Sequence, residues 1–142
     1  MLDPFTLATG VAGLLSLTIE LSKIISAYTQ SLNDASREAQ ELLAELSELS
    51  HVLEQLKDFL RSENAKSNSF DGTSVLCSAR NACQGKLEYA LRKFMKMSEG
   101  SKLSQSIKRL KWPLDKQENL DTVNTLHRCT QTFQFSLTIE GW

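Results

Sequence analysis

Residues 35–60 read ASREAQELLAELSELSHVLEQLKDFL, and this stretch decides the fold class. Apolar residues recur in it three and four positions apart, which is the spacing of one face of an α-helix. The face comprises Ala35, Ala39, Leu42, Leu46, Leu49, Leu53, Leu56 and Leu60. Asn33 and Asp34 stand just before it and are good helix caps. The stretch predicts a long helix with one continuous buried seam.

Residues 1–32 predict a second helix, which is more apolar than a soluble helix needs to be. Asp3 and Pro4 suit the N-cap and the first helical position. One face with the same spacing holds Leu7, Val11, Leu14, Thr18, Leu21, Ile25, Tyr28 and Leu32. Further apolar side chains lie off this face, namely Phe5, Leu15, Leu17, Ile19 and Ile24. Such a helix is buried on several sides or meets lipid or a partner.

The length of the uncharged segment limits what this first helix can do alone. Residues 4–19 carry no charge and would span about 24 Å as a helix, short of the ~30 Å hydrocarbon core. A permanent membrane anchor is therefore not expected. Asp3 in place of a basic region, and a helical pattern that continues unbroken, also argue against a signal peptide.

The C-terminal half predicts two more helices and a short one. A polar loop is expected over residues 64–73, followed by a helix from about Ser74 to Ser98 that stops at Gly100. A short amphipathic helix should run from Leu103 to Trp112, where Pro113 ends it. The last helix should begin near Asp115. Residues 132–139 alternate apolar and polar side chains, but helix is favoured because no second strand could pair with them.

Length and composition predict one domain, residues 1–142, that is an all-α bundle of four main helices plus the short helix before Trp112 and Pro113. A chain of 142 residues can bury enough apolar surface for a core. Its three cysteines, Cys77, Cys83 and Cys129, are an odd number, which favours reduced thiols in the cytoplasm over a disulfide framework.

Charge is segregated along the chain although the net charge is only −1. Residues 34–63 hold eight acidic and three basic side chains, whereas residues 80–116 hold ten basic and three acidic ones. The simplest interpretation is that an acidic and a basic helix pack side by side. Attraction of the basic segment to anionic lipid is the second interpretation. Nucleic acid is the least favoured partner, because no recognition motif is present.

No residues form a catalytic pattern, and we expect neither an enzyme, a small-molecule substrate nor a cofactor. His51 stands alone on the acidic helix, and His127 and Cys129 are two residues apart, which points them to different helix faces. Phosphate-binding glycine loops and Cys-x-x-Cys pairs do not occur.

Three stretches carry a family resemblance: MLDPFTLATGVAGLLSL at residues 1–17, the leucine heptads, and RLKWPL at residues 109–114. Together they resemble the fungal HeLo-like domain, which stands at the N-terminus of NOD-like (STAND) receptors and of related cell-death proteins. The resemblance implies a helical bundle that is cytoplasmic at rest. It also implies that oligomerisation releases the N-terminal helix into the plasma membrane. A C-terminal nucleotide-binding or signalling module is compatible with such a protein.

Two functions follow, a membrane-acting effector and an adaptor or oligomerisation bundle that never touches lipid. In the effector, the inserting residues would be Phe5, Leu7, Val11, Leu14, Leu15, Leu17 and Ile19. Close helix contacts would come from Ala8, Gly10, Ala12, Gly13 and Ser16. Glu20 and Lys23 would line a pore. Anionic headgroups would bind Arg92, Lys93, Lys96, Lys108, Arg109 and Lys111. Phe5, Leu17 and Ile24 lie off the seam, and a contiguous exposed apolar patch usually marks an interface, so we expect either self-association or a further segment of the bundle that covers them.

Overall fold

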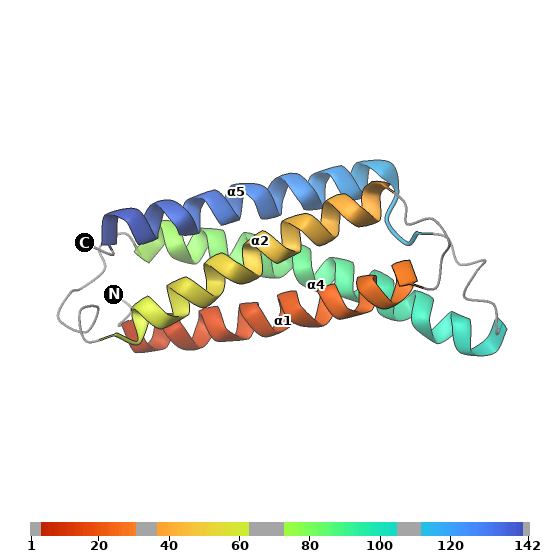
Figure 1. Ribbon diagram of the computed structural model, residues 1–142, viewed down its shortest axis with the longest axis horizontal. Helices are drawn as coiled ribbons and strands as arrows, with labels where there is room; N and C mark the ends of the chain where they lie inside the picture. Colours follow the sequence, from red (N-terminus) through yellow and green to blue (C-terminus); the bar gives the residue numbers. More distant parts are fainter. Residues whose placement is uncertain (1–3, 31–36, 63–72, 105–111, 141–142) are drawn as a thin grey trace.

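The computed structural model is a bundle of four long helices (Figure 1), which confirms the predicted all-α fold. It describes residues 4–30, 37–62, 73–104 and 112–140. The helices are α1 (Pro4–Gln30), α2 (Arg37–Leu60), α4 (Thr73–Ser104) and α5 (Lys116–Glu140). The predicted short helix before Trp112 falls largely on residues 105–111, which lie outside the described ranges.

Each helix makes its main contacts with two of the others. α1 packs against α2 and α4, and α5 packs against the same two helices from the opposite corner. α1 and α4 run in one direction, while α2 and α5 run in the other (Figure 1). α2 and α4, consecutive among the described helices, therefore lie diagonally across the bundle. The apolar pattern of α1 allowed burial on several sides, and in the structure α2 and α4 cover it while α5 lies diagonally opposite.

The α2 seam is buried along its whole described length, as its heptads predicted. Its buried side chains are Ala39, Leu42, Leu46, Leu49, Val52, Leu53, Leu56 and Leu60. Leu46 and Leu53 are fully buried, in the same core cluster as Leu14, Leu21 and Phe94. The outer side of α2 carries ion pairs typical of a solvated helix. Ala35, the first residue of the predicted seam, lies outside the described residues.

α4 is longer than predicted, because it passes through Gly100 and reaches Ser104. A glycine ends a helix by adopting the left-handed conformation, whereas its missing side chain alone costs a helix only about 1 kcal/mol. Composition at one position could not distinguish these two roles. Leu103, the expected start of the short helix, belongs to α4.

α5 begins where Asp115 was expected to start it. The Asp115 carboxylate accepts a hydrogen bond from the Glu118 backbone N–H at 2.7 Å, and the Asp115 N–H donates to the Glu118 carboxylate at 3.0 Å. This reciprocal pair is a capping box, which satisfies two backbone donors at the start of the helix. α5 continues through the alternating stretch after residue 132, so the preference for helix over strand is confirmed.

Candidate functional site

The apolar side chains of α1 face the bundle core. Leu7, Val11, Leu14 and Leu15 are all buried, although they were predicted to enter lipid after activation. Leu17 is half-buried and packs against the core, whereas Ile19 is 41% exposed. The side chain of Phe5 lies outside the described residues. At rest, the bundle therefore conceals most of the described part of the predicted insertion surface.

The outer side of α1 is made mainly of small and polar residues. Gly13, Ser16, Glu20 and Lys23 are exposed there. Ala12 is half-buried and Ala8 is buried, so the predicted small-residue contacts divide between the core and the surface. Of the off-seam residues Phe5, Leu17 and Ile24, the two described ones, Leu17 and Ile24, are half-buried and pack against the core, so other segments of the bundle cover them, as the second of our two alternatives expected. Their position off the seam left them beside neighbouring helices rather than in solvent.

Gly10 permits a close contact between α1 and α4. A Cβ atom at this position would lie 2.9 Å from Nη1 of Arg80 and 3.3 Å from its Cδ. The long side chain of Arg80 thus lies directly over the Gly10 backbone, and its Nε is buried without a hydrogen-bond partner among the described residues. In the resting bundle, Gly10 accommodates a side chain of α4.

Trp112 holds the C-terminal end of α1 against the rest of the bundle. Its ring lies 5.4 Å from that of Tyr28 on α1 and 4.9 Å from that of Phe94 on α4, measured between centroids. The Trp112 indole N–H also donates to the side-chain oxygen of Asn119 on α5 at 3.1 Å. These contacts join three helices at one point. The Trp-Pro-Leu motif is therefore a structural latch, which we call the Trp112 latch.

The first turn of α5 supports this latch through Glu118. The Glu118 carboxylate accepts hydrogen bonds from the Tyr89 hydroxyl and the Asp115 backbone N–H, and it lies 3.4 Å from the Lys93 ammonium. These contacts lower the pKa of Glu118 to about 2, the hydrogen bond from Tyr89 having the largest effect. Glu118 therefore remains ionised and connects α4 to the start of α5 at neutral pH.

The basic segment lies away from the acidic helix. α4 carries Arg92 and Lys96 on its surface, while α2 carries the acidic excess at the diagonally opposite corner. Side-by-side packing of an acidic and a basic helix does not explain the segregation, because these two helices are not close neighbours. Lys93 is half-buried and is engaged with Glu118 and the Tyr89 ring. Three further predicted headgroup ligands, Lys108, Arg109 and Lys111, lie outside the described residues.

A wide groove of about 1070 Å³ runs between α4 and α5. Small side chains line it on both helices, including Ala79, Ala82, Gly85, Thr125 and Cys129. The groove contains basic and acidic groups together, such as Arg128 and Asp121. Sequence patterns did not reveal this groove, because its shape depends on which helix faces pack together. The spacing of residues within a single helix carries no information about its neighbours.

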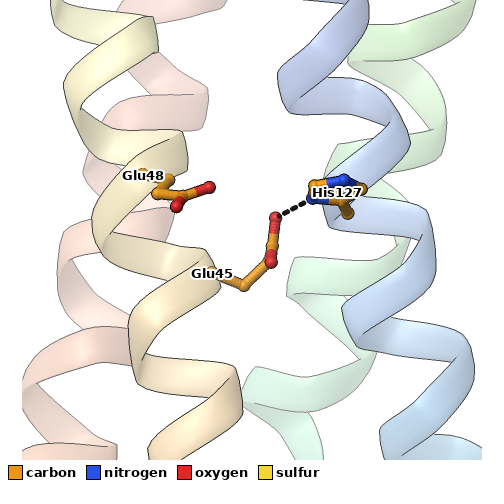
Figure 2. A group of neighbouring side chains, drawn as sticks. All are labelled: Glu45, Glu48 and His127. Atoms are coloured by element: carbon orange, nitrogen blue, oxygen red, sulfur yellow. Dashed lines mark hydrogen bonds and ion pairs between the residues drawn. The ribbon is translucent and has the colours of Figure 1, made fainter.

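Glu45, Glu48 and His127 form a cluster between α2 and α5 (Figure 2). One potential ligand atom from each lies within 4.8 Å of the others, so the three side chains could hold a metal ion. Their observed contact is a 3.0 Å hydrogen-bond distance between His127 Nδ1 and a Glu45 oxygen, which connects the two helices. The group is mostly solvent-exposed, and this helix-to-helix contact explains it without a metal. The pair is separated by 82 positions, so no local motif could have revealed it.

Comparison with known protein families shows which family the chain belongs to. The model of the N-terminal domain of the pigment biosynthesis cluster protein PigL matches residues 2–134, and the chain belongs to this family. This match is compatible with the fungal HeLo-like resemblance of the sequence. No curated protein and no solved structure matched the chain significantly.

Proposed function

We propose that this domain is a membrane-acting effector of fungal cell death. At rest it keeps α1 in the bundle, and after self-assembly it inserts this helix into the plasma membrane. The observation that carries the proposal is α1 itself. By length and composition, Thr6–Gln30 is long and apolar enough to cross a membrane. Its apolar side chains extend beyond one seam, a pattern that suits burial on several sides as well as contact with lipid.

Release of α1 would break its packing against α2 and α4, and its C-terminal end is held by the Trp112 latch. Loss of that latch would free Tyr28 while leaving the α2–α5 and α4–α5 contacts in place. Release of α1 therefore does not require the whole bundle to unfold.

Self-assembly would lower the cost of placing the charged residues of α1 in the bilayer. Glu20 and Lys23 would each cost about 2.5–3.5 kcal/mol near the bilayer centre if a single copy inserted. Several copies could turn these two side chains toward a watery lumen while Leu15 and Ile19 face lipid. Ala8, Ala12 and Ser16 would then provide close helix contacts.

The basic residues of α4 would bring the domain to an anionic leaflet. Arg92 and Lys96 are exposed, and each basic side chain near such a surface contributes about 1 kcal/mol. Because this attraction is screened by salt, binding to phosphatidylserine vesicles should weaken as ionic strength rises.

Dye release from phosphatidylserine-containing vesicles tests the proposal with two matched variants of the full chain. Ile19→Glu places a charge on the exposed side of α1, where the side chain is 41% exposed. Phe135→Glu does the same on α5, where the side chain is 64% exposed. Both substitutions should leave the fold intact. We expect Ile19→Glu to abolish release and Phe135→Glu to retain it.

Equal release by both variants would contradict insertion of α1. An assembled wild-type chain that releases no dye would leave the second function, an adaptor or oligomerisation bundle, as the better account. Neither function requires catalysis or a cofactor.

A further inference from the structure

Two cysteines, one on α4 and one on α5, lie in the core beside the groove between these helices. Cys83 on α4 is fully buried, and Cys129 on α5 is 4% exposed. The Cys129 thiol lies 3.4 Å from the carbonyl oxygen of Ala79, which is one helical turn before Cys83 on the same face of α4. Cys83 and Cys129 belong to the same core cluster, and each thiol is near enough to shift the pKa of the other. Cys83 and Cys129 thus form a dithiol pair between two packed helices.

The two sulfur atoms are chemically different. The neighbouring Cys83 thiol lowers the pKa of Cys129, and the charge of Arg128 acts in the same direction. The neighbouring Cys129 thiol, together with burial, raises the pKa of Cys83. Cys129 is therefore the better nucleophile of the pair, and Cys83 keeps its proton.

The groove supplies access to only one of them. Cys129 belongs to the groove wall, as do Thr125 and Arg128, whereas Cys83 is fully buried and does not line the groove. A small polar oxidant in the groove can reach the Cys129 sulfur first. Cys77 is half-buried on α4 and does not line the groove, so it provides an internal comparison.

We propose that Cys129 and Cys83 form a redox modification site that reacts with a small hydroperoxide and closes into a disulfide between α4 and α5. Cys129 attacks the peroxide as a thiolate, the O–O bond breaks, and the leaving oxygen departs as an alcohol or as water after taking up a proton. Cys129 becomes a sulfenic acid. Cys83 then loses its proton, its sulfur attacks that of Cys129, and the hydroxyl group leaves as water.

Atoms and electrons balance in this reaction. Two thiols are oxidised, the peroxide is reduced by two electrons, and a sulfur–sulfur bond replaces two S–H bonds. The product would covalently join α4 to α5, which are already packed together in the bundle. The inference is independent of the membrane proposal, because it needs neither lipid nor release of α1.

Hydrogen peroxide treatment of the reduced full chain tests this site. Peptide mapping without reductant should show a Cys83–Cys129 bridge, and the intact chain should lose two hydrogen atoms. The oxidised chain should unfold at a higher temperature than the reduced chain, and dithiothreitol should reverse the increase. Cys77→Ala should behave like the wild type in all three measurements.

Two further variants separate the roles of the paired thiols. Cys83→Ala should stop at a sulfenic acid on Cys129, which dimedone will trap, while Cys129→Ala should form neither product. Circular dichroism checks that both variants are folded, and the wild-type peptide map does not depend on them. The proposal is wrong if the wild type keeps both thiols under peroxide that oxidises a free cysteine peptide. It is also wrong if the bridge contains Cys77.

Discussion

α1 and α2 are neighbouring helices of similar length that use their apolar residues differently. In α2, the apolar residues form one seam, and this seam is buried against the core. In α1, apolar residues such as Leu15 and Leu17 lie off the seam as well, and the core partly accommodates them. The composition of α2 is explained by the resting bundle alone. The bundle thus buries α1 beyond a single seam and leaves Ile19 exposed, and α1 is the helix to which our membrane proposal gives a role.

The seams of both helices should be equally necessary for folding. Leu46→Ala in α2 and Leu21→Ala in α1 should each lower the free energy of unfolding by about 2–5 kcal/mol, because both side chains are fully buried. Chemical denaturation measures this effect. A loss below about 0.5 kcal/mol for Leu21→Ala alone, typical of a surface position, would mean that α1 is not a core helix in solution.

Loss of the Trp112 latch should have the second largest effect on the free energy of unfolding, and the latch contacts α1 rather than α2. Two ring contacts of about 0.5–1.5 kcal/mol each and one hydrogen bond of similar size predict a loss of about 2–4 kcal/mol for Trp112→Ala. Thermal unfolding measures the loss. The same variant should release vesicle dye at lower protein concentration than the wild type, because the end of α1 is freed.

Trp112→Phe is the matched control for the latch. It keeps an aromatic ring between Tyr28 and Phe94 but removes the donor to Asn119, so its effects should be smaller in both measurements. If Trp112→Ala destabilises the chain without changing dye release, the latch supports the fold and does not control α1.

The sequence predicted the helices well because their patterns are local. Heptads of α2, the Asp115 start of α5 and the apolar face of α1 each depend on residues within a few turns of one another. Gly100 was misassigned because its effect on a helix depends on its backbone conformation. The diagonal placement of α1 and α5 was also missed, since helical spacing does not state which helices become neighbours.

The candidate site was predictable only in part for the same reason. Repeated apolar residues mark α1 as unusual from its amino-acid sequence alone. The partners of Trp112, the proximity of Cys83 to Cys129 and the His127–Glu45 contact join residues far apart in the sequence. Such pairs are determined by the packing of the helices, which the pattern within a single helix does not contain.

Acid should loosen the Trp112 latch, which holds the end of α1, before it disrupts the buried seam of α2. The folded pKa of Glu118 is about 2, below its ordinary value of 4.5. The stabilisation from its ionised form is therefore present above about pH 4.5 and is lost as the pH falls toward 2. Protonation weakens the start of α5, which also holds Asn119 against Trp112.

Trp112 fluorescence in a Trp142→Phe background measures this loosening between pH 5 and pH 2. We expect the emission to change before helical circular dichroism is lost. Glu118→Gln removes the titrating group and should reduce the pH dependence. An unchanged acid response in Glu118→Gln would assign the effect to other carboxylates.

The smallest predicted effect distinguishes the resting role of α1 from its proposed membrane role. Gly13 is exposed, and a Cβ atom added there would meet no atom within 4 Å. Gly13→Ala should therefore stabilise the bundle by about 0.5–1 kcal/mol, since glycine is unfavourable within a helix.

A larger side chain at the same position would separate helices that approach closely in lipid. Gly13→Leu should consequently reduce dye release while leaving the resting bundle folded, and Ala27→Leu, at another exposed position on α1, is its matched control. Equal dye release from the two leucine variants would show that Gly13 makes no close contact in the membrane, and the resting bundle alone would then explain the off-seam apolar residues of α1.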